Sequence, residues 1–339
     1  MRVSLFIAAI TAMGSVAVSP LYAQSPTNQA PTDTAKKELT KMPGKLASIG
    51  MESTPFIFQG RQLMLDCYRP STDCGFAPET NYLAIFDLKD GRELTRFGTR
   101  HSLACAFVEG DVVHVFAPDS KGMKDTITKD NWFQDIQHYS STDLKSWKRE
   151  LAIPRADGEH LLNSSVCRDE EGYLMAYETD EPVKFCFKFA RSNDLDQWEK
   201  VPGLAFTGEK KEYSACPVIR YFKPYYYVIY LHAAIPGHNG WVSFLARSKD
   251  LAAWQLSPKN PILEAGEGEG INNSDVDLIE IDGKTYVYFA TGDQATWADL
   301  RQAIYPGPMQ EFFESYFPEG ARMTEVSARV PMPSESPAP

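Results

Sequence analysis

The sequence predicts an all-β protein, a five-bladed β-propeller with four-stranded antiparallel blades. A short motif, S-x-D-L-x-x-W, recurs about every fifty residues, at 141–147, 192–198 and 248–254. Hairpin patterns with Gly, Asp-Gly or Pro turns occur at five places, residues 53–65, 102–116, 164–177, 214–230 and 274–289. Self-similarity at this period, in segments rich in β-branched and aromatic residues, is typical of propellers, whose blades hold about four short strands each.

The motif itself indicates architecture rather than chemistry. Its Ser and Asp side chains are expected to bond backbone amides at a turn, and its Trp is expected to fill the gap between neighbouring blades. The first blade keeps only Phe86-Asp87-Leu88 of the motif, and the last has a helix-like segment at residues 309–317 instead. Atypical terminal repeats are usual where an array must close.

The segments outside the repeats have a different composition. Residues 1–23, with Arg2 before an apolar stretch from Leu5 to Val18 and a cleavage site after Ala23, predict a signal peptide and therefore a secreted or periplasmic protein. Residues 24–45 predict a flexible leader, 46–320 the propeller, and 321–339 a C-terminal segment with a Pro/Ser-rich tail. No later stretch reaches the ~18 apolar residues of a spanning helix, so no membrane span is expected.

Charge and cysteine spacing exclude some function classes. The formal net charge is −11 without any evident basic cluster, which argues against a nucleic-acid partner. The six cysteines form no Cys-x-x-Cys or Cys/His zinc pattern, so we expect no metal site of that kind and no cofactor. Cys105, Cys167 and Cys216 occupy matching positions in three hairpins and are expected to be small buried hydrophobic residues.

The candidate site follows from propeller geometry. The start of the first strand and the end of the second strand of every blade should meet at one end of the axis. Four carboxylates at such places are the catalytic candidates, Glu52, Glu178, Asp275 and Asp277. The substrate-binding candidates are His101, Asn163, Glu212, Tyr213, His232 and Asn273. Acidic groups in a desolvated funnel acquire separated pKa values, as acid/base catalysis requires, and they also leave room for a structural cation.

The motif, the hairpins and the segments 213–217 and 272–277 resemble the five-bladed propeller glycosidases, over roughly residues 50–318. That group comprises the arabinanase and xylosidase family, the invertase family and the neoagarobiose hydrolases. The resemblance implies a glycoside hydrolase. It also implies a base or nucleophile at the start of the first blade, where this chain has Glu52.

The chain departs from this group at the general acid. The invertase-like Glu-Cys-Pro motif and its arabinanase counterpart both place a Glu where this sequence has Ala215, before Cys216-Pro217. Glu178, at the end of a second strand, is therefore the predicted acid, and Glu52 is the predicted base. Asp275 or Asp277 is expected to adjust the pKa of a neighbour, and inversion is the expected outcome if the site is arabinanase-like.

We therefore expect an exported glycoside hydrolase that cleaves a poly- or oligosaccharide by carboxylate acid/base catalysis. Two alternatives remain open. A non-catalytic carbohydrate-binding propeller would account for Ala215. A glycoside phosphorylase would need basic groups to hold phosphate, for which Arg69, Arg168 and His101 are the candidates.

Overall fold

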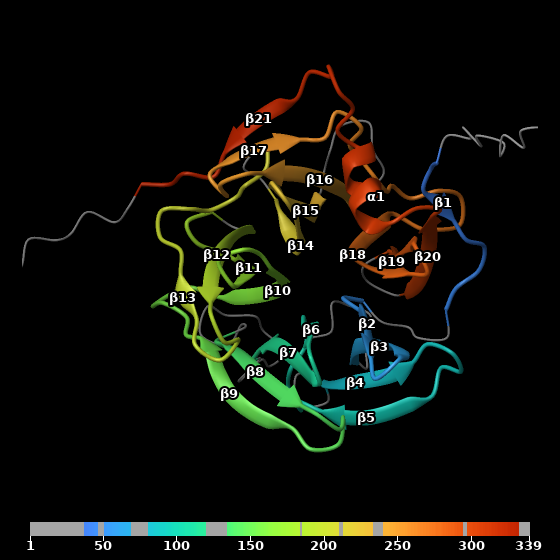
Figure 1. Ribbon diagram of the computed structural model, residues 1–339, viewed down its shortest axis with the longest axis vertical. Helices are drawn as coiled ribbons and strands as arrows, with labels where there is room; N and C mark the ends of the chain where they lie inside the picture. Colours follow the sequence, from blue (N-terminus) through green and yellow to red (C-terminus); the bar gives the residue numbers. More distant parts are fainter. Residues whose placement is uncertain are drawn as a thin grey trace, which may run out of the picture. The chain divides into compact units, whose positions relative to one another are not determined.

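Five antiparallel sheets surround a central axis in the computed structural model (Figure 1), which describes residues 37–46, 51–68, 81–119, 134–183, 185–209, 213–232, 240–293 and 297–331. Blade one contains β2 to β5, Thr54–Phe58, Arg61–Tyr68, Tyr82–Asp87 and Glu93–Phe97. Blade two contains β6 to β9, Cys105–Glu109, Val112–Pro118, Ile136–Ser141 and Lys148–Ile153. Blade three contains β10 to β13, Leu161–Arg168, Tyr173–Thr179, Cys186–Ser192 and Glu199–Lys200.

Each of the last two blades includes one strand from a distant part of the chain. Blade four contains β14 to β17 and β21, Ala215–Phe222, Tyr225–His232, Val242–Ser248, Ala253–Leu256 and Thr324–Ser327. Blade five contains β18 to β20 and β1, Asn272–Ile281, Lys284–Gly292, Ala298–Tyr305 and Thr40–Lys41. The N-terminal strand β1 therefore pairs with β20 and joins the two ends of the blade series. Strands β1 and β21 lie in the stretches predicted as the leader and the C-terminal segment.

The fold prediction is confirmed, because all five predicted hairpins form the two inner strands of a blade. The turn between β18 and β19 illustrates why. Ile281 pairs with Lys284, so Asp282 and Gly283 form a two-residue loop, and both have positive φ angles of 50° and 70°. An Asp-Gly pair tolerates this conformation and matches the twist of the strands.

The repeated motif forms the same turn after the third strand of blades two, three and four. In blade three the Ser192 hydroxyl accepts hydrogen bonds from the amides of Asp194 and Leu195, at 3.2 and 2.9 Å. The Asp194 carboxylate accepts two further amide hydrogen bonds, and Leu195 adopts a φ of 69°. The same serine and aspartate bonds to backbone amides recur at Ser141 and Asp143 and at Ser248 and Asp250.

Each motif Trp packs against the preceding blade, as predicted. Trp147 stacks on Phe97 of blade one, with ring centroids 3.8 Å apart, and Trp198 meets Phe116 of blade two edge-on at 5.4 Å. Trp254 is fully buried 6.0 Å from Phe189 of blade three. The motif is therefore an architectural device that closes a turn and seals a blade interface.

The helix-like segment expected in place of the last motif is the helix α1, Met309–Ser315. Its buried residues Phe312 and Phe313 pack into an apolar cluster with side chains of β15, β18 and β19. Phe313 stacks on Tyr227 with centroids 5.0 Å apart. The helix thus fills, with two aromatic rings, the space that a motif Trp fills in the other blades.

Candidate active site

Three side chains from different blades converge where the inner strands begin, because local backbone features direct them there. Glu52 precedes β2 with a φ of 58°, Cys216 lies in β14 with a φ of 48°, and Asp275 lies in β18 with a φ of 51°. The strand register shifts at both β14 and β18 around these residues. Bulges and left-handed non-glycine residues concentrate at functional sites, where they redirect a side chain out of the regular alternation.

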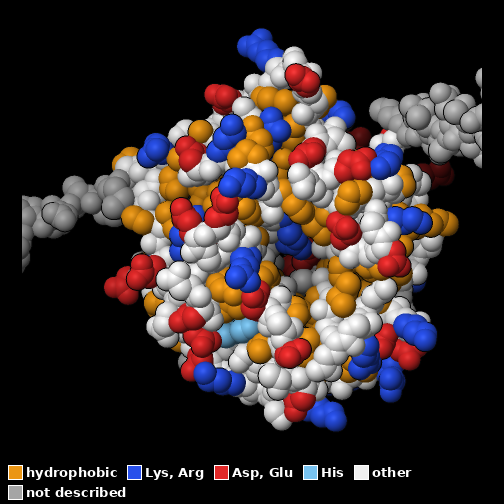
Figure 2. Space-filling model, viewed as in Figure 1, with side chains coloured by type: hydrophobic (Ala, Val, Ile, Leu, Met, Phe, Trp, Pro, Cys, Tyr) orange, Lys and Arg blue, Asp and Glu red, His pale blue; other side chains and the backbone are white. Residues whose placement is uncertain are grey.

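These residues line a small pocket that is open to solvent. Blades one to five all contribute to its wall, through Glu52, Ser53, Thr54, Ala104, Asn163, Ser164, Cys216, Pro217, Val218, Asp275, Val276 and Asp277. The hollow at the centre of the propeller in Figure 2 has Lys or Arg side chains at its floor, whereas the residues that line this pocket include none, so the two are distinct. The pocket places polar atoms from separate blades within reach of one small ligand group.

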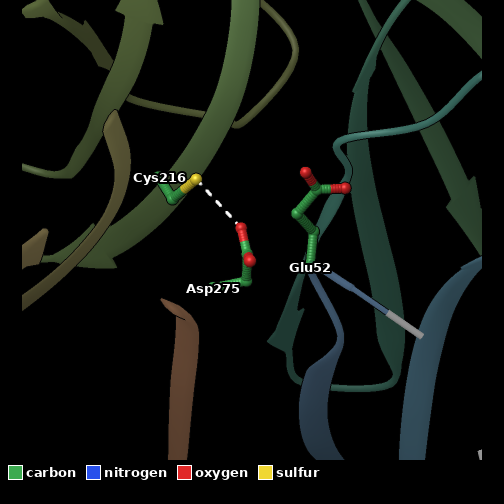
Figure 3. A group of neighbouring side chains, drawn as sticks. All are labelled: Glu52, Cys216 and Asp275. Atoms are coloured by element: carbon green, nitrogen blue, oxygen red, sulfur yellow. Dashed lines mark hydrogen bonds between the residues drawn. The ribbon is translucent and has the colours of Figure 1, made fainter. Parts of the chain in front are cut away.

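The two carboxylates of Glu52 and Asp275 face a common space with the Cys216 thiol beside them (Figure 3). One oxygen of each carboxylate and the Cys216 sulfur all lie within 4.8 Å of one another. Cys216 Sγ donates a hydrogen bond to Asp275 Oδ1 at 3.0 Å, and the Ser274 hydroxyl donates a short one to Asp275 Oδ2. The same three side chains are also the described pocket residues best placed to ligate a cation.

Glu178 lies behind this pocket rather than in its wall. Its side chain is 2 % exposed at the end of β11, and its Oε2 accepts hydrogen bonds from Asn163 Nδ2 and from the Cys216 amide, each at 2.8 Å. Burial raises the pKa of Glu178 to about 7, and the negative charge of Asp275 acts in the same direction. Glu178 was expected to point into the funnel, and the structure places its hydrogen-bond partners Asn163 and Cys216, rather than Glu178 itself, in the wall of this pocket.

Asp277 lines the pocket but has a strong partner. Its Oδ1 lies 2.5 Å from Arg220 Nη2 and accepts a hydrogen bond from the Leu278 amide at 2.7 Å. Burial raises the pKa of Asp277, and the Arg220 guanidinium opposes that rise. Asp277 is therefore held in an ion pair with Arg220. Asp275, in contrast, accepts hydrogen bonds from two uncharged donors, Cys216 and Ser274.

Of the predicted substrate-binding residues, Asn163 lines the pocket and four others lie elsewhere in the propeller. His101 is buried, with Nδ1 3.0 Å from the Pro118 carbonyl oxygen and its ring edge-on to Tyr139, and burial lowers its pKa to about 4. Tyr213 packs on Phe185 with ring centroids 4.7 Å apart.

Two further predicted substrate-binding residues, His232 and Asn273, are held by packing or by hydrogen bonds. His232 lies edge-on to Phe244 at 5.2 Å. Asn273 is fully buried, and its Nδ2 donates to Glu269 Oε2 and to the Asn272 carbonyl. Glu212, a predicted substrate-binding residue, and Arg69, a candidate group for phosphate, lie outside the described residues. Position near the start or end of an inner strand therefore did not by itself separate pocket residues from buried ones.

Sequence reasoning missed Cys216, which it counted with Cys105 and Cys167 as a small buried hydrophobic residue. The other two are indeed buried, but Cys216 is half-buried in the pocket wall and donates to Asp275. The difference arises from the register shift in β14 between Ala215 and Val218. Composition does not reveal a bulge. The neighbouring Pro217 was the one sequence signal that the hydrogen-bond ladder between β14 and β15 is interrupted there.

No protein-family model matches the sequence, and the search of curated proteins finds no match. Solved structures do match. The BT0996 RGII complex is 17 % identical with a TM-score of 0.61, and the match covers 80 % of this chain and 93 % of that one. The GH43 endo-arabinanase from Bacillus licheniformis is 10 % identical with a TM-score of 0.53, covering 76 % and 94 %.

A third structure extends the comparison to another glycosidase family. The Bombyx mori GH32 β-fructofuranosidase BmSUC1 is 11 % identical with a TM-score of 0.52, and the match covers 78 % of this chain and 61 % of that one. The chain shares the fold of these proteins. The resemblance drawn from the sequence is thus confirmed at the level of the five-bladed propeller. No helix in the described part of the chain is long and apolar enough to cross a membrane.

Proposed function

We propose that this chain is an exported glycoside hydrolase that cleaves a glycosidic bond in a poly- or oligosaccharide, with Glu52 and Asp275 as its two reacting carboxylates. The observation that carries the proposal is their approach to within 4.8 Å across the axial pocket. Glycoside hydrolysis uses such a pair on either side of the scissile bond. The shared fold with GH43 and GH32 enzymes supports the same chemistry.

The environments of the two carboxylates suggest different roles. Asp275 accepts hydrogen bonds from Cys216 and Ser274, which fix both of its carboxylate oxygens in the pocket. Glycoside hydrolysis needs one carboxyl group as acid and one as nucleophile, and we assign these roles to Glu52 and Asp275 respectively. Glu52 then protonates the leaving oxygen while Asp275 attacks the anomeric carbon. In the second step Glu52 accepts a proton from the water that releases the sugar.

The separation of the pair supports retention of configuration rather than the inversion expected from the sequence. Carboxyl groups of retaining enzymes lie about 5–5.5 Å apart, whereas inverting enzymes need about 6.5–9.5 Å for a water molecule. One oxygen of Glu52 lies within 4.8 Å of one oxygen of Asp275, a contact between nearest atoms that is compatible with carboxyl groups in the first range. Proton NMR of the first-formed anomer distinguishes the two outcomes.

In this proposal Glu178 is a positioning residue and not the acid. Its carboxylate holds the Cys216 amide and Asn163 Nδ2, and Cys216 in turn donates to Asp275. Replacement of Glu178 therefore alters the placement of Asp275 without removing a reacting group. The export part of the proposal rests on the signal-peptide pattern of residues 1–23, and N-terminal sequencing of the exported protein tests it.

The test is release of reducing sugar from arabinan, xylan, fructan, agar and carrageenan oligosaccharides, with and without phosphate. Glu52→Gln and Asp275→Asn should each lower the rate at least about 100-fold, because each removes a reacting carboxyl group. Glu178→Gln should cost less, and Glu171→Gln, at a carboxylate 72 % exposed on the surface, is the matched control. Full activity in both pocket variants would refute this site.

One observation keeps a non-catalytic carbohydrate-binding propeller as the second candidate. Ala215, at the position where related enzymes carry an acid, is 1 % exposed in β14 and offers no polar atom to a ligand. Glycan binding without any product from the wild-type protein would favour this function. Cleavage that requires phosphate would instead identify a phosphorylase.

A further inference from the structure

Blade two contains a pair of buried histidines that the proposed function does not use. His114 lies on β7 and His138 on the adjacent β8, with side chains buried between blades two and three. Nδ1 of His114 lies 2.9 Å from Nε2 of His138, and the rings stack with centroids 5.1 Å apart. The hydrogen bond between the imidazoles uses only one nitrogen of His138 and leaves its Nδ1 for another partner.

The internal repeat shows that these histidines are departures from the blade pattern. Counted back from the motif serine, His138 corresponds to Phe189 in blade three and Leu245 in blade four, both fully buried. By strand register, His114 corresponds to Leu174 and Tyr227. Burial of an imidazole at a core position carries a desolvation cost, and the other blades pack with apolar or aromatic residues at these positions. Packing of the blade interface therefore does not explain the two histidines.

Two carboxylates complete a cluster around Nδ1 of His138. Asp196 Oδ1, on the motif turn of blade three, lies 3.3 Å from His138 Nδ1, and Glu150 is the cross-strand partner of His138 on β9. One ligand atom from each of the three residues lies within 4.8 Å of the other two. The turn does not need the Asp196 side chain, because Asp194 makes the turn hydrogen bonds and the other copies have Lys145 and Ala252 there.

We propose that His138, Glu150 and Asp196 bind a divalent transition-metal ion, with Zn²⁺ preferred, at the interface of blades two and three. An imidazole nitrogen with two carboxylate oxygens is a ligand set that suits Zn²⁺, with water as the fourth ligand. His114 provides the support that metal-binding histidines usually have. When His138 Nε2–H donates to His114 Nδ1, the lone pair of His138 Nδ1 faces the two carboxylates.

The charges around the cluster are compatible with a cation. Lys148 Nζ lies 2.7 Å from Glu150 Oε2 and supplies the positive charge that a bound metal would replace. Its side chain is 62 % exposed and can swing into solvent. A bound ion would connect two strands of blade two to the turn of blade three.

Zinc titration of the full chain after removal of metals with EDTA tests the proposal, by calorimetry and by thermal unfolding with ZnCl2 or CaCl2. One zinc ion should bind and raise the Tm, because a ligand of the native state stabilises it, and calcium should have a smaller effect. Asp196→Asn and His138→Phe should each weaken zinc binding at least about tenfold. Lys148→Ala should strengthen it, since the competing ammonium is removed.

Two controls separate this site from the axial pocket and from a folding defect. Asp275→Asn disrupts the pocket cluster and should leave the zinc-induced Tm shift unchanged. Asp196 is 45 % exposed, so Asp196→Asn keeps the test valid even if His138→Phe does not fold. Unchanged zinc affinity in Asp196→Asn, an equal response to calcium, or no binding by the wild-type chain would each overturn the proposal.

Discussion

At the scale of single residues, the candidate site depends on a few side chains that leave the regular strand pattern. Cys216 and Asp275 belong to strands, yet each adopts a left-handed backbone conformation that turns it into the pocket. Glu178 obeys the regular alternation and is buried, and its charge state therefore depends on its environment. The chemistry of each carboxylate follows from these local differences.

Burial of Glu178 makes a prediction about stability and pH. Its pKa is about 7 in the folded protein and 4.5 in the reference state, so the folded form binds the proton more tightly. The contribution of this group is fully present below pH 4.5 and is lost as the pH rises through about 7. The loss amounts to at most about 3 kcal/mol of unfolding free energy.

Glu178→Gln should remove this dependence, because the amide stays neutral and its carbonyl still accepts the bonds from Asn163 and Cys216. Urea denaturation of both proteins at pH 4.5, 6 and 7.5 measures it. Other buried acids, such as Asp277, contribute equally to both proteins and cancel in the difference. A difference between the two proteins that is constant with pH would contradict the prediction.

At the scale of elements, the motif turn is the unit that repeats and the unit that joins the blades. Its Ser and Asp stabilise a tight turn, its Leu takes a positive φ, and its Trp covers the preceding blade. Where the motif is absent in blade five, α1 supplies Phe312 and Phe313 to the same kind of interface. Sequence similarity between the copies thus reflects a common packing requirement.

Ser192→Ala tests the contribution of one such turn. The substitution removes a hydroxyl that accepts two amide hydrogen bonds, so it should cost about 1–2 kcal/mol of unfolding free energy. Asn193→Ala, at an exposed position in the same turn, is the matched control and should change stability by less than about 0.5 kcal/mol. Equal effects of the two changes in urea denaturation would argue against the assigned role.

At the scale of the whole propeller, closure depends on a short strand from the N-terminal side. β1 pairs with β20, and the Met42 and Leu46 amides donate to Gln302 and Leu300 carbonyls at 2.8 and 2.9 Å. Lys41 forms an ion pair with Glu269 at 2.5 Å. These contacts cover the outer edge of blade five, which otherwise exposes unpaired backbone groups.

Comparison of chains that start at residue 37 and at residue 46 tests this closure. The shorter chain lacks β1 and its backbone pairing, and its unfolding free energy should be lower by about 2–4 kcal/mol. It should also associate at high concentration through the uncovered edge of β20, which light scattering would detect. Identical stability and association of the two chains would show that β1 does not contribute to closure.

The sequence by itself determined the number of blades, the inner hairpins, the architectural role of the motif and the last helix. These features arise from local chemistry, because Asp-Gly turns, Ser/Asp turns and aromatic strands have their preferences within a few residues. It also identified Glu52, which precedes an inner strand, and Asn163, Asp275 and Asp277, which lie within inner strands, as residues of the pocket, since repeat position alone places them near the axis.

Only the tertiary structure decided which of these groups face one another. The bulges in β14 and β18 bring Cys216 and Asp275 into the wall, and Glu178 is left behind them. The pairing of β1 with β20 likewise joins distant parts of the chain, with Thr40 opposite Ile304. Such outcomes depend on register and on contacts between blades, which composition and spacing along the chain do not specify.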